Sequence, residues 1–177
     1  MNEIWQTTNQ QPWVQAIVDG LITAKTRTTK PCVPEGSVIL LHASKSSLWR
    51  YWRGLKWVDK LKSPIKEIPR GKVVAVATVK KVGLSERVLK KGEYKYWDVY
   101  NYVNEQGNLF YNSVARYAIR FSNVVSLKSP VDAKGFQAPF ARAKPQTVVD
   151  ILDANPSLED TVYGDILVEY PRLVRKS

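Results

Sequence analysis

The stretch KVVAVATVKKV, residues 72 to 82, constrains the fold more than any other part of the sequence, because it is its clearest strand. Further strands are expected near residues 2–7, 24–29, 36–42, 115–127 and 164–170, and helices near residues 10–19, 46–61, 92–107 and 145–155. Strands in the majority with helices between them predict an α+β fold built on a small mixed β-barrel. Thr8 or Asn9 should cap the helix at 10–19, and Gly20 should follow its end.

Length and cysteine content limit the class of protein. A chain of 177 residues fits one domain, residues 1–177, that can bury its own core. Its single cysteine, Cys32, can form neither an internal disulfide nor a cysteine-rich zinc site, so we expect no metal and no cofactor. No signal peptide and no apolar run of membrane-spanning length is evident, so we expect a cytoplasmic protein that does not enter a membrane.

The positive charge is concentrated in one segment. Between residues 45 and 96 there are fifteen Lys and Arg residues against four acidic ones, which accounts for the net charge of +11 of the whole chain. A local basic excess is typical of a surface that binds a polyanion, since each neutralised phosphate releases counterions. A lysine-rich surface that serves only solubility is the alternative.

Two motifs in order resemble the ASCH domain family, a branch of the PUA-like superfamily. The first is QQPWVQAIVDGLITAKTR followed by PEGSVILLHASK, and the second is YAIRFSNVVSLKSPVDAKGFQAPF. Together they cover residues 4–45 and 70–140. The resemblance implies a PUA-like barrel with flanking helices that binds RNA, DNA or a modified nucleoside. Helical insertions would then lie at about 46–69 and 86–108, the first of them basic and Trp-rich, with a C-terminal extension at about 141–177.

Some family members resemble acetylcytidine amidohydrolases, which use a Lys, a Thr and a Glu. The corresponding positions here hold Ile22, Lys25 and Ala75, while the family's Arg is kept as Arg27. A hydrolase needs a nucleophile or an activated water beside a base. These substitutions argue against that activity.

The strand at 24–29 presents phosphate-binding chemistry instead. Alternate residues share a face, so Lys25 and Arg27 should point one way and Thr26 and Thr28 the other. If the first pair faces a cleft, Arg27 can grip a phosphate with two hydrogen bonds while Lys25 acts as a point charge. The alternative is an outer strand whose cations stand in water.

The only histidine, His42, is expected at the end of a strand beside Ser44 and Lys45. A lone His is most simply a hydrogen-bonded structural residue. ASCH-like ribonucleases nevertheless leave open that His42 and Lys25 act together on a phosphodiester.

The segment SLWRYWRGLKW interleaves basic and aromatic residues, a pattern that suits single-stranded nucleic acid. Its tryptophans could instead fill a satellite core. We therefore predict a non-catalytic protein that binds nucleic acid, RNA before DNA or a nucleoside, and leave its oligomeric state open. The alternatives are a ribonuclease or nucleoside hydrolase, and a protein-interaction module. The expected binding residues are Trp13, Lys25, Thr26, Arg27, Thr28, His42, Ser44, Lys45, Trp49, Arg50, Arg53, Trp57 and Lys60.

Overall fold

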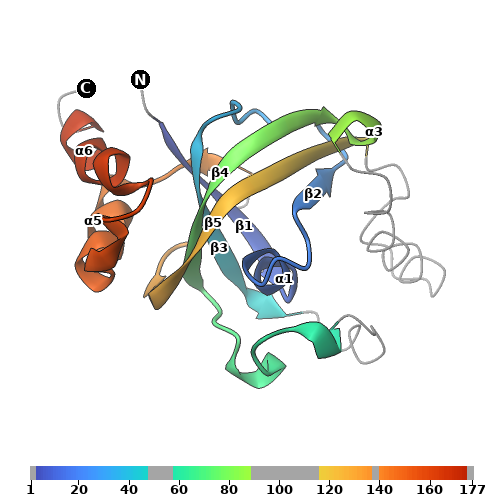
Figure 1. Cartoon of the computed structure of the whole chain (residues 1–177), viewed down its shortest axis with the longest axis horizontal. Helices are drawn as coiled ribbons and strands as arrows, with labels where there is room; N and C mark the ends of the chain where they lie inside the picture. Colours follow the sequence, from blue (N-terminus) through green and yellow to red (C-terminus); the bar gives the residue numbers. More distant parts are fainter. Residues whose placement is uncertain (1–2, 48–57, 89–115, 137–139, 175–177) are drawn as a thin grey trace.

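A computed structural model describes residues 3–47, 58–88, 116–136 and 140–174 of the chain. Its centre is one curled sheet with the strand order β2-β5-β4-β3-β1-β6 (Figure 1). β1 and β3 are parallel, and the other neighbours are antiparallel. The strands are β1 (Ile4–Gln11), β2 (Ala24–Arg27), β3 (Val38–Ser47), β4 (Lys72–Leu84), β5 (Tyr117–Asp132) and β6 (Ala141–Arg142).

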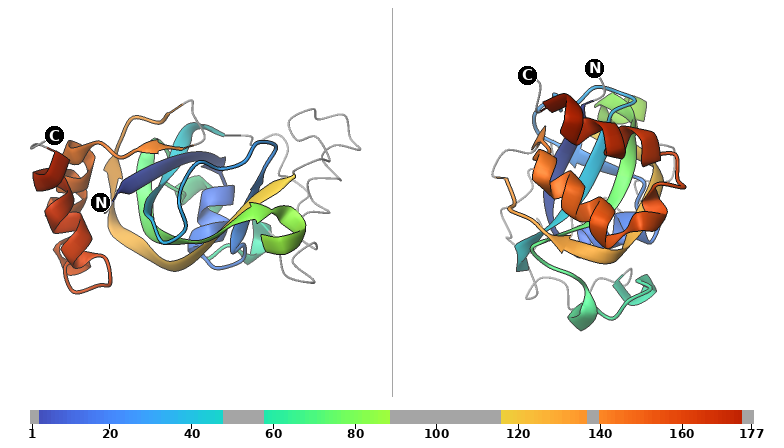
Figure 2. Two further views of the ribbon diagram at one scale, coloured as in Figure 1. Left: turned by 90° about the horizontal axis from the view of Figure 1, so that it is seen from above. Right: turned by 90° about the vertical axis from the view of Figure 1, so that its left-hand side faces the viewer.

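Helices cover both faces of this sheet. The helices are α1 (Trp13–Val18), α3 (Ser85–Val88), α5 (Pro145–Ala154) and α6 (Gly164–Val174), and the short 3-10 turns are η1 (Val58–Lys60), η2 (Ile65–Glu67) and η4 (Pro156–Leu158). Figure 2 shows α5 and α6 side by side across one side of the sheet, while α1 lies within its curve. In the part of the chain that the structure describes, no helix is both long and apolar enough to cross a membrane.

The sheet has two buried faces, which we name by the helices that pack on them. On the inner face, Ile39 and Leu41 of β3 pack with Val14 and Ile17 of α1. On the outer face, Val38 and Leu40 of the same strand pack with residues of α5 and α6. The alternation along β3 is that of a strand buried on both sides. Successive residues of β3 therefore alternate between the outer face and the inner face.

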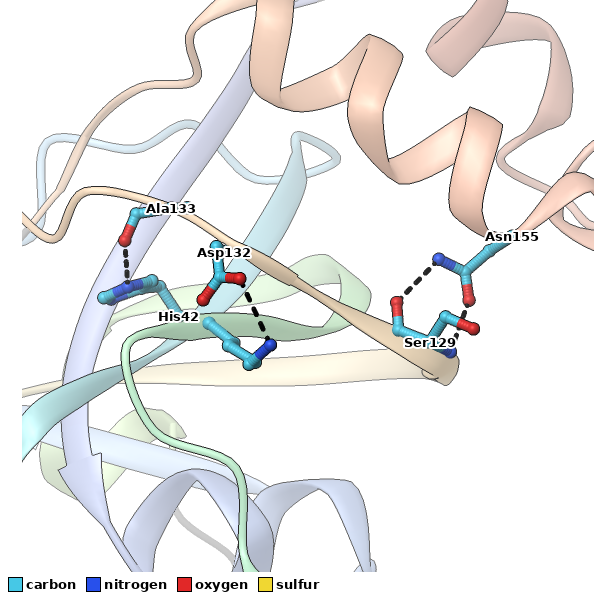
Figure 3. Close-up of polar contacts among 6 residues, drawn as sticks. His42, Ser129, Asp132, Ala133 and Asn155 are labelled. Carbon is cyan, nitrogen blue, oxygen red and sulfur yellow. Dashed lines mark hydrogen bonds and ion pairs between the residues drawn. The ribbon is translucent and has the colours of Figure 1, made fainter.

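The side chain of Asn155, the residue that follows α5, joins this helix to β5 on the outer face. Asn155, which is 3% exposed, accepts a hydrogen bond from the backbone N–H of Ser129 at 2.9 Å and donates to the carbonyl oxygen of Ser129 at 3.0 Å (Figure 3). Its amide also donates to the carbonyl oxygen of Ile151, 3.1 Å away within α5. The end of β5 is thus bonded to the end of α5.

The predicted α+β fold is confirmed, with strands at each of the central positions expected from the sequence. The predicted start of the first helix is wrong. β1 runs on to Gln11, and the Gln11 side-chain oxygen accepts the backbone N–H of Gln15 at 3.0 Å, the role expected of Thr8 or Asn9. A glutamine that ends a strand can reach the first turn of the next helix, because its side chain is one methylene longer than that of asparagine.

The prediction of a strand at 164–170 is also wrong, because these residues begin α6. The buried positions are Gly164, Leu167, Tyr170 and Pro171, and their spacings of three and four residues follow a helix rather than a strand. β3 extends to Ser47, so the first two residues of the expected insertion at 46–69 belong to a strand. Most of the expected insertion at 86–108 lies outside the described residues.

Candidate nucleic-acid interface

Lys25 and Arg27 project to the inner face of the sheet. β2 pairs with β5 so that Lys25 lies opposite Ile119, and antiparallel partners share a face. Ile119 belongs to the core on the α1 side. Both cationic side chains are partly buried, which is the orientation expected if this strand lines a binding site.

The curl of the sheet brings Arg27 of β2, at one end of the strand order, to β1 near the other end. Its Nη2 atom donates to the side-chain oxygen of Asn9 on β1 at 3.1 Å. Its guanidinium carbon lies 5.4 Å from the centre of the Phe140 ring, within range of a cation–π interaction. Two contacts from different parts of the chain thus hold the guanidinium plane in place. Asn9, Lys25, Arg27 and Phe140 are called the inner cluster below.

Asn9 brings an unused donor into this cluster. Its side chain is 4% exposed, and its oxygen accepts the hydrogen bond from Arg27. Because the oxygen is identified by that bond, the other atom is the amide nitrogen, Nδ2. Nδ2 is buried and has no hydrogen-bond partner among the residues that the structure describes. A buried donor without an acceptor is costly, about 1–3 kcal/mol.

The environment of Lys25 disfavours its charge. Burial, and after it the positive charge of Arg27, hold the pKa of Lys25 well below its ordinary value. Both causes act in the same direction, because a desolvated ammonium group beside a second cation is raised in free energy. A bound anion would offset both penalties through its attraction for the two cations, so the inner cluster is suited to a negatively charged ligand rich in hydrogen-bond acceptors.

His42 lies on the outer face instead. Its Nε2 atom donates to the carbonyl oxygen of Ala133 at 3.0 Å (Figure 3). Burial lowers the pKa of His42, and the backbone of Ala133 and Gly71 opposes this shift through hydrogen bonding. His42 lines a pocket of about 700 Å³ together with Ser44 and Lys45. The structure therefore gives the imidazole the backbone contact of a structural histidine.

The two groups of candidate residues are separated by the sheet. His42 is in register with Thr8 of β1, and Arg27 bonds Asn9, the next residue of that strand. Successive residues of a strand point to opposite faces. The pair of Lys25 and His42, considered above for a ribonuclease, is not brought together.

The remaining predicted residues lie in different surroundings. Thr26 is buried opposite Ala118, Thr28 is exposed beyond the end of β2, and Trp13 opens α1 with its side chain partly buried. Lys60 is exposed in η1, close to Lys62, whose backbone N–H donates to the Asp19 carboxylate after α1 at 2.8 Å. Trp49, Arg50, Arg53 and Trp57 lie outside the described residues.

Asn9 and Phe140 were not predicted as site residues. The sequence pattern predicts Thr8 or Asn9 as a helix cap, whereas Asn9 bonds a partner 18 positions away. Phe140 closes the second ASCH-like motif, which was the only signal in the sequence that pointed to it. Ile22 and Ala75 pack in the inner core, so they supply no catalytic group. Within residues 3–47, 58–88, 116–136 and 140–174, no group of His, Cys, Asp and Glu is arranged to hold a metal ion.

Comparisons with known proteins agree with this fold. Neither a protein-family model nor a curated protein matches the sequence. Among solved structures, the ASCH protein of Zymomonas mobilis matches with a TM-score of 0.53 and 11% identity, over 88% of this chain and 97% of the other. A serine-to-alanine variant of that protein matches with a TM-score of 0.53 and 12% identity, over 87% and 97% of the two chains.

A tyrosine-to-phenylalanine variant of the same Zymomonas protein gives a TM-score of 0.52 at 11% identity, over 86% of this chain and 99% of the other. The chain described here therefore has the α+β fold of the Zymomonas ASCH protein. This likeness is one of fold, and it agrees with the family resemblance of the two sequence motifs.

Proposed function

We propose that this chain binds nucleic acid, with RNA preferred over DNA, through the inner cluster and without catalysis. The observation that carries the proposal is the buried Asn9 amide donor, which has no acceptor among the described residues and lies beside Arg27. Lys25 adds a second cation on the same face. Phosphate oxygens are acceptors only and carry negative charge, so they match all three groups.

Arg27 and Lys25 have different tasks in this proposal. The contacts with Asn9 and Phe140 orient the guanidinium group, which can then bind a phosphate through two parallel hydrogen bonds. Lys25 contributes a point charge whose cost falls when the anion arrives. RNA is preferred as the ligand because the ASCH resemblance implies it, and we expect this binding to occur in the cytoplasm.

The proposal is tested by titrating the full chain with a short single-stranded RNA over a series of salt concentrations. The variant Lys25→Met/Arg27→Gln removes both charges while keeping side chains of similar length. Its matched control is Lys128→Ala/Lys144→Ala, which removes two charges at exposed positions that are not part of the inner cluster. A charge-assisted hydrogen bond contributes roughly 1.5–3 kcal/mol, so the inner variant should bind about a hundredfold or more weakly. Equal affinities of the inner variant and the control would refute the proposal.

The salt series also tests the basic segment between residues 45 and 96. For a single strand, the slope of log affinity against log salt is about −0.7 per phosphate contacted. Replacing Arg50, Arg53 and Lys60 with Ala should flatten this slope if the segment extends the footprint. A single-stranded DNA of the same length, titrated in parallel, separates RNA preference from general binding of nucleic acid.

The low pKa of Lys25 favours a second candidate function, cleavage of RNA. A lysine that releases its proton readily can act as a general base. The test is to incubate an end-labelled RNA with the wild-type chain and with Lys25→Met. We expect intact RNA in both cases. Cleavage by the wild type alone would replace the binding function with a ribonuclease.

A further inference from the structure

The pocket on the outer face is lined by the buried side chain of His42 and by more exposed polar residues around it. It measures about 700 Å³ and is lined by Thr8, His42, Ser44, Lys45, Ser46, Gly71 and residues 132–135. Pockets of about 300–1,000 Å³ are typical of sites for small ligands and cofactors. The size therefore suits a nucleotide better than a bare inorganic ion.

One wall of this pocket belongs to a segment held by three hydrogen bonds with side chains of β1 and β3, which we call the strap (residues 133–136). Gln6 Nε2 donates to the carbonyl oxygen of Lys134 at 3.1 Å, and His42 Nε2 donates to that of Ala133 at 3.0 Å. The backbone N–H of Phe136 donates to the Thr8 hydroxyl at 3.1 Å. Gln6 and His42 are each only 1% exposed. These bonds hold the wall in place before any ligand arrives, which lowers the entropy cost of binding.

Glycines set the positions of the surrounding groups. A Cβ atom on Gly71 would lie 2.9 Å from Cγ of Lys45, so the aliphatic part of Lys45 lies directly against this glycine. Gly71 has φ +67°, a conformation that other residues rarely adopt. A Cβ atom on Gly135 would lie 3.0 Å from the His42 ring. Both close approaches depend on the missing side chains.

The charge of the lining is positive. Lys45 of β3 and Lys134 of the strap both line the pocket, so two segments of the chain contribute a cation to it. The one acidic residue of the lining, Asp132, forms an ion pair with Lys72 at 3.3 Å, which offsets its charge. Ser44 and Ser46 also line the pocket, and their hydroxyl groups lie 3.1 Å from each other. Lysine ammonium groups and serine hydroxyls are groups that commonly bind phosphate.

We propose that this outer pocket is a second binding site, which holds the phosphate group of a nucleotide between Lys45 and Lys134. The nucleotide is either free or one unit of a nucleic-acid strand. The choice of a nucleotide over another phosphate compound rests on the proposed function, whereas the pocket, its lysines and its strap do not. The site lies on the opposite face of the sheet from the inner cluster, so the two can be inactivated separately.

The experiment uses the full chain with Lys25→Met/Arg27→Gln as background, so that the inner cluster does not contribute. The four ribonucleoside 5′-monophosphates, inorganic phosphate and a short RNA are each titrated while the backbone amide signals of Gly71, Lys134 and Gly135 are followed by NMR. Lys45→Ala/Lys134→Ala is then added to the background, and Lys128→Ala/Lys144→Ala serves as the charge-matched control. Thermal melts verify that all variants are folded.

We expect these three amide signals to shift with at least one nucleotide or with the RNA. The variant without Lys45 and Lys134 should bind tenfold or more weakly, and the control should bind like the background. A response to the free nucleotides identifies a free ligand, and a response to RNA alone identifies a strand. The proposal is overturned if no probe but inorganic phosphate binds, if the Lys45 and Lys134 variant binds as well as the background, or if the control loses as much affinity. Wild-type RNA affinity in the background variant would refute the proposed function but not the outer pocket.

Discussion

Thr8 and Asn9 are neighbours in β1, yet they serve opposite faces of the sheet in different ways. On the outer face, Thr8 joins Gln6 and His42 in hydrogen bonds to the backbone of the strap. On the inner face, Asn9 bonds the guanidinium group of Arg27. The outer residues bond the backbone of the strap, whereas the inner residues combine two cationic side chains with an amide donor that has no acceptor among the described residues.

This difference implies different energetics for the two faces. Hydrogen bonds from buried side chains to the strap satisfy backbone groups that would otherwise be costly to bury. The inner cluster does the reverse, since it desolvates Lys25 next to Arg27 and leaves the Asn9 amide nitrogen without an acceptor among the described residues. Substitutions on the outer face should therefore lower stability, and substitutions in the inner cluster should lower binding.

The largest expected effect on stability is that of His42→Ala on the outer face. This substitution leaves the Ala133 carbonyl oxygen without its donor and opens a cavity beneath Gly135. The free energy of unfolding should fall by about 2–3 kcal/mol, measured by denaturant titration. His42→Gln can restore a donor and should recover part of the loss. A fully stable His42→Ala variant would show that the strap does not depend on this bond.

Asn155→Ala should lower the free energy of unfolding by less than His42→Ala does. Asn155 is another side chain on the outer face that forms hydrogen bonds with the backbone. The substitution removes its bonds to Ser129 and Ile151, but water can replace some of them because Ser129 is exposed. We expect a loss of about 1–2 kcal/mol in the free energy of unfolding. The control is Gln146→Ala in the same helix, whose exposed bond to Asp150 should contribute less than about 0.5 kcal/mol. Equal losses in both variants would contradict the assigned role of Asn155.

In the inner cluster, the substitution Lys25→Met should raise the free energy of unfolding instead of lowering it. Because the pKa of Lys25 is lower in the folded chain than its ordinary value of 10.5, the unfolded chain binds more protons between these two pKa values. The stability of the wild type should therefore rise with pH across this interval relative to Lys25→Met. The variant should be the more stable protein below the interval, and the advantage should vanish above about pH 10.5. Urea titrations at several pH values measure the difference in the free energy of unfolding between the two proteins. A difference that does not change with pH would argue against a depressed pKa of Lys25.

Much of the fold could be predicted from the sequence, because strands such as β4 and β3 are strongly β-rich and the two ASCH-like motifs occur in order. The strand predicted for GDILVEY is wrong because these residues begin α6, whose buried positions are spaced by three and four residues. The orientation of Lys25 and Arg27 followed from strand alternation together with the family resemblance.

The division into two sites could not be predicted. It depends on the parallel register that sets His42 beside Thr8, and on the curl that carries Arg27 to Asn9. A shift of one residue along β1 moves each of its side chains to the other face of the sheet. The boundaries of strands predicted from a motif are less certain than one residue, so the sequence could not show that the two sites lie on opposite faces. The strap and its glycines likewise depend on contacts between residues more than 90 positions apart.

The central claim, that the inner cluster binds phosphate through an oriented guanidinium group, is tested most directly by the RNA affinity of Arg27→Lys. This variant keeps the positive charge but loses the planar fork that Asn9 and Phe140 hold in place. Measured against the wild type in the same buffer and salt, it should bind a short single-stranded RNA about tenfold more weakly while its melting temperature stays close to that of the wild type. A dissociation constant equal to that of the wild type would contradict the account, because charge alone would then explain the binding.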